Sequence, residues 1–508
     1  MAVHAAAHSP RRNLEDSIAT PHPEEEQPSD YSRKWYVLAA VSMGIFLSTI
    51  DGSIVNVALP TLVSDLHAEF STIEWVVLAY LLTLATLLLS IGRLGDMIGK
   101  KPLYVTGFAV FTVGSVLCGL APTAHWLIGF RVLQAMGGSM ILALGMAIVT
   151  ESFPPSERGR ALGLTGTMVS VGVVVGPTLG GLLLGALSWH WIFFVNLPVG
   201  IVGTLMAVRF LPASRPKGQQ RFDPLGAGVL FTGLLALLAG LTTGGDHGFG
   251  STRVVLLLAA AAVLLALFVL IERRVSQPII DLCLFRNKLF TVNLVSGLTT
   301  FICMSGTIIL IPFFLQGVLG FSAQRTGLLM AAVPAAMGFV APVSGALSDR
   351  LGPRPITVVG LASMALGFLA MTTVNAQMGT MGYILRFLPV GLGMGIFQSP
   401  NNSAIMGAVP RARLGVASGL LTMTRTLGQT TGIAVMGAIW SSRVFYHSGA
   451  VLPAGATAAP AAAQVAGLQD TFHLMIGLLC AGLALSIWGL VQERRAESPK
   501  GLRVPELR

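Results

Sequence analysis

The chain has 508 residues, of which 53% are hydrophobic and only 11% are charged. Soluble globular chains carry about 25% charged residues, so this composition excludes a soluble enzyme, a disordered scaffold and a secreted disulfide-rich domain. A net charge of +10 often indicates a nucleic-acid-binding protein, but the distribution of the charges along this chain gives a different reason for it.

Apolar segments recur along the chain at the length of a membrane-spanning helix. Such a helix needs about 20 apolar residues to cross roughly 30 Å of hydrocarbon, and the sequence predicts fourteen of them. Residues 1–34 are polar without an apolar core, so we expect a disordered cytoplasmic tail there rather than a signal peptide. The predicted spans are 35–58, 75–92, 102–121, 125–149, 161–184, 190–210, 225–242, 253–271, 290–315, 325–346, 356–374, 382–406, 416–440 and 471–491.

The basic residues fall on one side of this predicted bundle. If the helices alternate in direction, 26 of the 32 Lys and Arg residues lie in the segments on the side of the N-terminus. The loops of the opposite side contain only Arg253, Arg325 and Arg443. Because Lys and Arg are enriched in cytoplasmic loops, we predict a multi-pass protein of the cell membrane with both termini in the cytoplasm. The positive charge then reflects topology and not binding to nucleic acid.

Two loops share a motif that indicates an internal duplication. The segment 92–101 follows the second predicted helix, 345–354 follows the tenth, and both fit G-x-L-x-D-x-x-G-x-[KR]. Arg131 and Arg386 recur at nearly the same separation, as do glycines of the fifth and thirteenth spans.

This duplication predicts the fold class. We expect an all-α membrane protein with two six-helix halves, 35–211 and 289–491, and two linker helices within 212–288. A cytoplasmic tail is expected at 492–508. Parallel repeats about an axis normal to the membrane are typical of transporters, in which the binding site lies between the halves.

Four ionisable residues lie well inside the predicted spans: Asp51, Arg131, Arg386 and Arg425. A charge at this depth is costly, so each is a functional candidate. Asp51 is the only acid among them, and its depth matches that of Arg131, which would allow the two to pair. The pair would couple protons or substrate to transport, or it would be a structural ion pair between the first and fourth helices.

Small and polar residues on the same helix faces are candidates for the wall of a cavity. Helical spacing places some of them beside Asp51 and Arg131, and others beside Arg425. For Arg386 and Arg425, lining the cavity and bonding to backbone carbonyls are equally expected. The candidate cavity residues are Gly44, Ser48, Gln134, Arg386, Thr422, Arg425 and Gln429.

The fifth span contains the glycine-rich motif Gly172, Gly176, Pro177, Gly180 and Gly181. Small residues at this spacing permit close contact between helices. Pro177 removes one backbone hydrogen bond and is expected to kink the helix. The motif serves either conformational change or packing alone.

The two repeated loops are candidates for a cytoplasmic gate. Their acidic and basic residues could form contacts that hold one conformation closed, besides fixing the topology. The gating candidates are Gly92, Arg93, Asp96, Gly99, Lys100, Lys101, Gly345, Asp349, Arg350, Gly352 and Arg354.

Other kinds of chemistry have little support in the sequence. The four cysteines show no paired spacing, so we expect neither a disulfide framework nor a metal site. No HExxH or GxSxG motif occurs, and we predict that the protein is not an enzyme.

Taken together, these motifs resemble the major facilitator superfamily and, within it, the fourteen-helix drug:proton antiporter family. The loop 92–101 is similar to the signature loop of the superfamily, and 127–134 to its helix 4 arginine motif. The motif beginning at Gly172 resembles the antiporter motif, and 50–60 and 189–200 resemble the family's motifs in helices 1 and 6.

This resemblance implies inward proton flow coupled to outward flow of a hydrophobic, often cationic compound, by alternating access. It makes Asp51 the proton-coupling acid and Arg131 its modulator. The expected partners are a small hydrophobic substrate, protons and the lipid bilayer; no cofactor is needed beyond the proton gradient, and a monomer suffices. The alternatives are a proton-coupled uptake symporter for a small metabolite and a membrane receptor that transports nothing.

Overall fold

The computed structural model describes residues 31–154, 156–212, 224–275, 282–409, 414–449, 452 and 455–497, and within them the chain is helical without a strand. Short 3-10 turns and one π-helical turn, Phe314–Val318, connect or extend the α-helices. The α-helices are α1 (Lys34–Asp65), α2 (Phe70–Ile98), α3 (Lys100–Gly119), α4 (Ala124–Ser152), α5 (Arg158–Ala186), α6 (Trp191–Phe194), α7 (Asn196–Phe210), α8 (Pro224–His247), α9 (Thr252–Glu272), α10 (Lys288–Phe313), α11 (Ala323–Leu351), α12 (Pro353–Met371), α13 (Thr380–Gly407), α14 (Leu414–Ser448) and α15 (Ala461–Glu497).

Thirteen helical segments of the described chain are long and apolar enough to cross a membrane. One of them combines α6 and α7, which together form the sixth predicted span. Helix α14 is not among the thirteen, although it has 35 residues and occupies the place of the thirteenth predicted span. The predicted all-α membrane fold is therefore confirmed, and fourteen spans are compatible with it.

Several helices are longer than the hydropathy pattern predicted. Helix α1 continues through Pro60 to Asp65, and α2 begins at Phe70 rather than at 75. In a membrane an unbroken helix satisfies the backbone groups that an irregular segment would leave unpaired, so one proline does not end it. Helix α15 runs over Ala461–Glu497, past both predicted ends of the last span.

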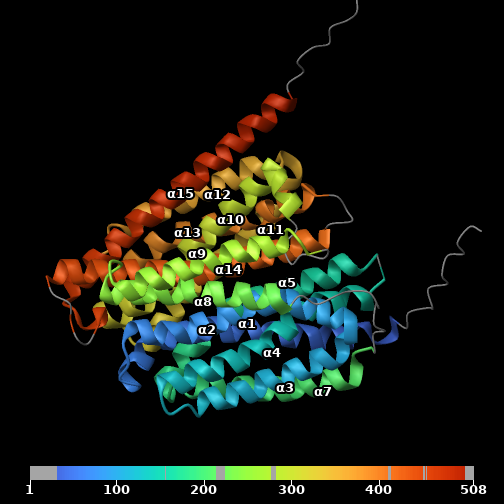
Figure 1. Ribbon diagram of the computed structural model, residues 1–508, viewed down its shortest axis with the longest axis horizontal. Helices are drawn as coiled ribbons and strands as arrows, with labels where there is room; N and C mark the ends of the chain where they lie inside the picture. The colour runs from blue at the N-terminus through green and yellow to red at the C-terminus, as the bar shows by residue number, and fades with distance from the viewer. Residues whose placement is uncertain are drawn as a thin grey trace, which may run out of the picture.

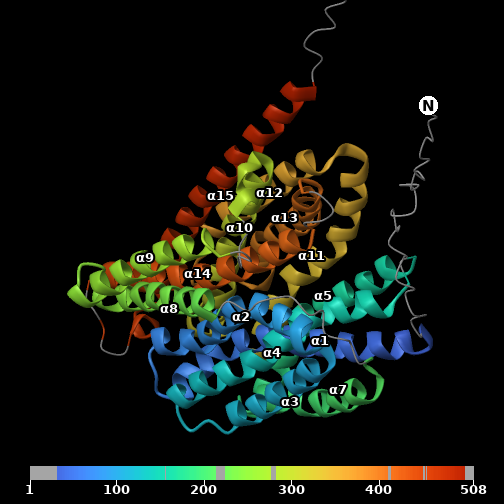
Figure 2. The ribbon, with the colours of Figure 1, turned by 45° about the vertical axis from the view of Figure 1, so that its right-hand side comes forward.

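The predicted tails and linkers lie largely outside the described residues. This holds for 1–30, for 498–508 and for the segments 213–223 and 276–281 of the predicted linker region. The described chain forms two bundles, α1–α7 and α10–α15 (Figures 1 and 2). Helices α8 and α9 pack on each other, and α8 contacts both α2 and α14, so this pair lies across the junction of the two bundles.

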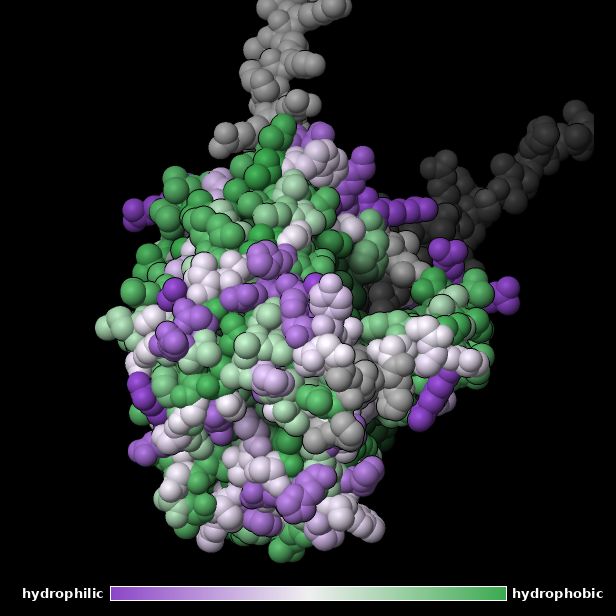
Figure 3. Space-filling view, turned by 90° about the vertical axis from the view of Figure 1, so that its left-hand side faces the viewer, coloured by the Kyte–Doolittle hydropathy of each residue, from purple (hydrophilic) through white to green (hydrophobic). Residues whose placement is uncertain are grey.

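The two ends of the bundle differ in charge and in packing. We call the end that contains the segments 93–101 and 350–354 the basic side, and the end that contains 66–69 and 319–322 the non-basic side. Figure 3 looks onto the non-basic side, where polar side chains are spread over the end face and apolar side chains crowd around it.

The two halves share one apolar core on the non-basic side. There the Phe70 ring packs edge-to-face on Phe313 and on Trp440, with ring centroids 5.0 and 5.1 Å apart. On the basic side each half has a core of its own, around Tyr104 in the first half and around Phe290 in the second. The halves are thus packed together on the non-basic side and separate on the basic side.

Candidate functional site

Asp51 and Arg131 form an ion pair inside the first half. Both side chains are buried, and Arg131 Nη1 lies 2.6 Å from Asp51 Oδ2. Arg131 Nε donates to the carbonyl of Val76 at 3.0 Å, and the guanidinium lies over the Tyr80 ring, 4.1 Å from its centre. The cation is therefore fixed by α1 and α2 together, and the pairing that the two depths allowed does form.

Two amides complete the surroundings of Asp51. Gln134 Nε2 and Asn196 Nδ2 donate to Asp51 Oδ1 at 2.8 and 3.0 Å. Both also donate to Ser115 Oγ, at 3.1 and 3.0 Å. Every partner of the Asp51 oxygens is an N–H donor, which suits a carboxylate that accepts and does not donate. The site joins α1, α3, α4 and α7.

Asn196 reaches this site because the sixth predicted span is broken. Helix α6 ends at Phe194, and α7 begins at Asn196. Pro198 lies in the first turn of α7, where a missing N–H costs nothing because no intrahelical acceptor is available there. Our sequence analysis treated 190–210 as one helix and gave Asn196 no role. The signal was present as a single amide in an apolar segment, two residues before a proline.

Glu74 is a second acid that sequence analysis placed outside the membrane. Because α2 begins at Phe70, Glu74 belongs to this helix, and it is only 2% exposed. It packs on α14 of the other half: a Cβ atom added to Gly437 would lie 3.0 Å from the Glu74 carboxyl carbon. A buried carboxyl group therefore lies at the contact that joins the halves on the non-basic side.

Three predicted cavity residues lie inside the first half and not on a cavity wall. Gly44 packs where an added Cβ atom would be 2.7 Å from Ile141 Cγ2, and Ser48 is buried. Gln134 belongs to the Asp51 site, as described above. A helical stripe identifies residues that share a face, but it does not say whether that face meets a cavity or neighbouring helices.

The two other membrane arginines differ from Arg131. Arg386 donates to Thr373 Oγ1 at 2.8 Å and to the carbonyl of Gly382 at 3.0 Å, which is the bonding alternative and not cavity lining. Arg425 lies on α14 over the ring of Phe301, with Thr422 and Gln429 one turn away on either side: Thr422 is exposed and Gln429 is partly buried.

The glycines of the fifth-span motif divide between two neighbouring helices. Three of them face α1 on both sides of Asp51 in the sequence, and Ser53 Oγ donates to the carbonyl of Gly172 at 3.1 Å. Added Cβ atoms would lie 2.9 Å from Thr49 Cβ at Gly172 and 2.8 Å from Ile54 Cγ1 at Gly180. The third glycine of this stripe, Gly176, faces Ser53.

The remaining residues of the motif face α11 of the other half. A Cβ atom at Gly181 would lie 2.6 Å from the carbonyl oxygen of Ala323. A Cβ atom at Gly327 of α11 would collide with the carbonyl oxygen of Pro177. Helix α5 is continuous through Pro177. The motif thus connects the helix that carries Asp51 to the contact between the halves.

The repeated loops have the same backbone turn but different contacts. Gly99 and Gly352 have φ angles of +100° and +83°, which glycine adopts far more readily than other residues. In the first loop Lys100 Nζ lies 3.1 Å from Asp96 Oδ1 and 2.8 Å from Glu151 Oε1, within one half. Gly92, Arg93 and Lys101 lie beside this turn on the basic side.

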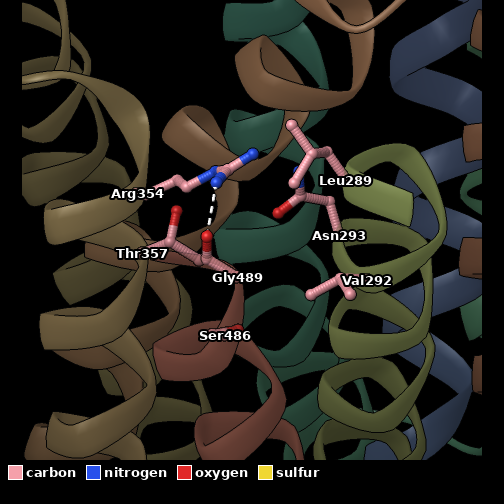
Figure 4. A pocket seen from close by; sticks show the side chains of 7 residues that line it. All are labelled: Leu289, Val292, Asn293, Arg354, Thr357, Ser486 and Gly489. Carbon is pink, nitrogen blue, oxygen red and sulfur yellow. Dashed lines mark hydrogen bonds between the residues drawn. The ribbon is translucent and has the colours of Figure 1, made fainter. Parts of the chain in front are cut away.

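In the second loop Arg354 anchors α12 to α15. Its Nη1 donates to the carbonyl of Gly489 at 2.7 Å, next to a small cavity into which the Asn293 side chain points (Figure 4). Asp349 and Arg350 are exposed at the end of α11, close to Gly345. The described contacts of both loops thus lie within single halves, so these loops do not hold the basic side closed here.

Comparison with known proteins agrees with this architecture. The family model of the Major Facilitator Superfamily matches residues 41–433. The riboflavin transporter RibZ of Clostridioides difficile is 34% identical over 82% of this chain and 90% of its own length. The multidrug transporter MdtP of Bacillus subtilis is 32% identical over 87% and 82%, and the multidrug resistance protein Stp of Mycobacterium tuberculosis 34% over 79% and 75%.

Solved structures share the fold at lower identity. A bacterial homologue of the human lysosomal transporter Spinster superposes with a TM-score of 0.64 and 18% identity, covering 92% of this chain and 99% of that one. At this identity the likeness describes the arrangement of helices and not the substrate.

Proposed function

Because the chain belongs to the Major Facilitator Superfamily, we propose that it is a proton-driven exporter of small lipophilic compounds that works by alternating access. Membership makes it a membrane transporter of small molecules and not an enzyme. Several relatives are named for multidrug resistance or antibiotic export. No cofactor enters the proposal, and one chain holds both the Asp51 site and the two halves that must move.

The observation that carries the proposal is the buried Asp51–Arg131 pair. In the arrangement described, N–H donors hold the carboxylate, and the basic side is the side on which the halves are separate. When the halves separate instead on the non-basic side, water reaches Asp51 and a proton binds to the carboxylate. The return movement carries that proton across, and re-pairing with Arg131 releases it on the basic side.

Packing supports a mechanical link between this pair and the movement of the halves. Gly172 and Gly180 pack on α1 beside Asp51, while Gly181 and Pro177 pack on α11. A change in the pairing of Asp51 can therefore reach the contact between α5 and α11 through one rigid helix. Substrate would leave on the non-basic side in the same movement that admits the proton.

The proposed direction of transport places the basic side in the cytoplasm, which accessible cysteines test. In a chain whose own cysteines are replaced by serine, Ser32→Cys and Ser156→Cys should react with an impermeant maleimide only after the membrane is opened. Ala458→Cys, exposed in the loop before α15, should react from outside the intact cell. Labelling of Ser156→Cys in intact cells would reverse the proposed orientation.

The proposed function predicts that the substrate and the proton move in opposite directions. In inside-out vesicles with an acidic lumen, adding a transported compound to the bath should make the lumen more alkaline, with saturation, as protons leave and the compound enters. Ethidium, 2-naphthoate and riboflavin are suitable probes, the last because a relative is named as a riboflavin transporter. Vesicles without the protein are the control.

Uptake is the second candidate, and the same relative favours it, since its name states no direction. A symporter would move protons and compound out of the lumen together, so a compound loaded inside would leave with the protons. A receptor would give no flux of any probe in either arrangement.

A further inference from the structure

Arg425 of α14 is a membrane-embedded charge that the proposed cycle does not use. Its guanidinium carbon lies 5.7 Å from the centre of the Phe301 ring on α10. Within the described residues it forms no hydrogen bond and no ion pair, whereas Arg131 and Arg443 each pair with a carboxylate. An unpaired charge inside a membrane protein is costly enough that it marks a functional site by default.

The surroundings of Arg425 are those of a binding site and not of the lipid-facing surface. The Phe301 side chain beneath the guanidinium is only 6% exposed, and Gly428, one turn along α14, packs on it. One turn earlier on α10, Gly297 faces the amide of Asn401 from α13, with 3.4 Å from an added Cβ atom to Nδ2.

Asn401 adds an unused polar group to this face of α10. It is 2% exposed, and its Oδ1 atom has no hydrogen-bond partner in the part of the chain that the structure describes. Buried amides are normally hydrogen-bonded, so an unsatisfied one points to a group that is bound in function. The amide NH2 can donate to a carboxylate, as can the N–H groups of Arg425.

The depth of Arg425 is suited to loading from the basic side. It lies eleven residues after Leu414, or about 16 Å along α14 from the basic end. Trp440, where the halves meet, is roughly 22 Å farther along the same helix. Glu74 packs on α14 at Gly437, roughly 18 Å beyond Arg425, so it is too distant to act as the counter-ion.

We propose that Arg425, Phe301 and Asn401 form an anion-binding site that selects small aromatic carboxylates for export. The guanidinium and the amide bind the carboxylate, and the apolar walls of α10 and α14 take the ring. This inference rests on the proposed export function, since it names the substrate class. It places the selective charge in the second half, away from the neutralised Asp51–Arg131 pair of the first half.

Equilibrium binding without a proton gradient tests the site separately from proton coupling. The full-length protein in lipid nanodiscs should bind 2-naphthoate more tightly than the uncharged 2-naphthamide, by roughly 10- to 100-fold for charged hydrogen bonds. Arg425→Gln should remove this preference by weakening naphthoate alone. Arg425→Lys, which keeps the charge without the planar fork, should keep part of it.

Arg386→Gln is the matched control, because this arginine lies at the same depth of its helix as Arg131 yet is bonded to Thr373 and Gly382. It should leave the naphthoate preference unchanged. Equal binding of naphthoate and naphthamide by the unmodified protein would overturn the proposal. A preference that survives in Arg425→Gln would overturn it too, and neither result bears on proton-driven flux.

The charge at the site can also be measured without a ligand. In the cysteine-free chain, Thr422→Cys, one turn from Arg425 on an exposed position, should react faster with an anionic thiosulfonate reagent than with a cationic one. Adding Arg425→Gln should lower that ratio several-fold. A ratio that does not change would mean that Arg425 does not set the potential of the site, and this reading needs only folded protein.

Discussion

Asp51→Asn is expected to abolish proton-driven transport, because asparagine cannot bind and release a proton. The structure adds a second effect, since the change leaves Arg131 buried without its counter-ion. Breaking one side of a buried ion pair costs about 3–5 kcal/mol, so the single variant should also be less stable. Stability alone could then explain lost transport.

The double variant Asp51→Asn/Arg131→Gln separates the two effects. It removes both charges and leaves amides that can bond with Gln134 and Asn196, so it should be more stable than Asp51→Asn. It should still fail to accumulate substrate under a proton gradient, while exchange of labelled for unlabelled substrate without a gradient continues. Asp51→Glu, which keeps a titrating group, should retain part of the gradient-driven rate.

The pH dependence of exchange gives an independent readout. In the unmodified protein, the exchange rate should change with pH as Asp51 binds or releases its proton, and in the double variant this dependence should disappear. If the double variant accumulates substrate at the parent rate under the same gradient, Asp51 and Arg131 form a structural pair. The proton must then use another carboxyl group, of which buried Glu74 is the first candidate.

The sequence was sufficient for features that depend on length, period and depth along single helices. The spans follow from apolar length, and the likeness of Asp51 and Arg131 in depth follows from the rise per residue. The repeat also predicted the matching turns, whose glycines both take positive φ angles. These properties belong to one segment at a time, so they can be read without knowing which helices touch.

Features that depend on helix ends and neighbours could not be predicted in this way. Glu74 fell one residue outside a predicted span because the apolar pattern begins after the helix does. The break before Asn196 is set by Pro198 and tertiary packing, which hydropathy does not detect. Arg386 matches Arg131 in the repeat, yet it bonds to Thr373 and a carbonyl, because no acid in the second half occupies the place of Asp51.

Gly327→Ala on α11 is expected to prevent the halves from closing on the non-basic side. The added methyl group would collide with the carbonyl oxygen of Pro177, and a backbone atom cannot turn aside as a flexible side chain can. Overpacking of this kind costs about 1–3 kcal/mol, which would shift the balance between the two arrangements by roughly 5- to 150-fold. Transport should fall accordingly, because each cycle must pass through the closed contact.

Gly338→Ala is the matched control, since it makes the same change on the same helix where nothing lies within 4 Å of the added methyl group. It should transport normally, and it should be as stable as the parent or more so, since alanine favours a helix more than glycine does. The two variants differ only in whether the methyl group meets α5. Any difference in transport between them is therefore due to the contact between the halves.

The position of the halves can be measured directly in these variants. A cysteine at Gln324, which lies against Gly181 and Gly185 of α5, should react slowly from the non-basic side in the parent and in Gly338→Ala. In Gly327→Ala it should react faster, because the contact that covers it no longer forms. Equal reactivity in all three would mean that α5 and α11 do not separate during transport. The glycines of the fifth-span motif would then serve packing alone, and the opening on the non-basic side would have to occur between α2 and α14, where Glu74 lies against Gly437.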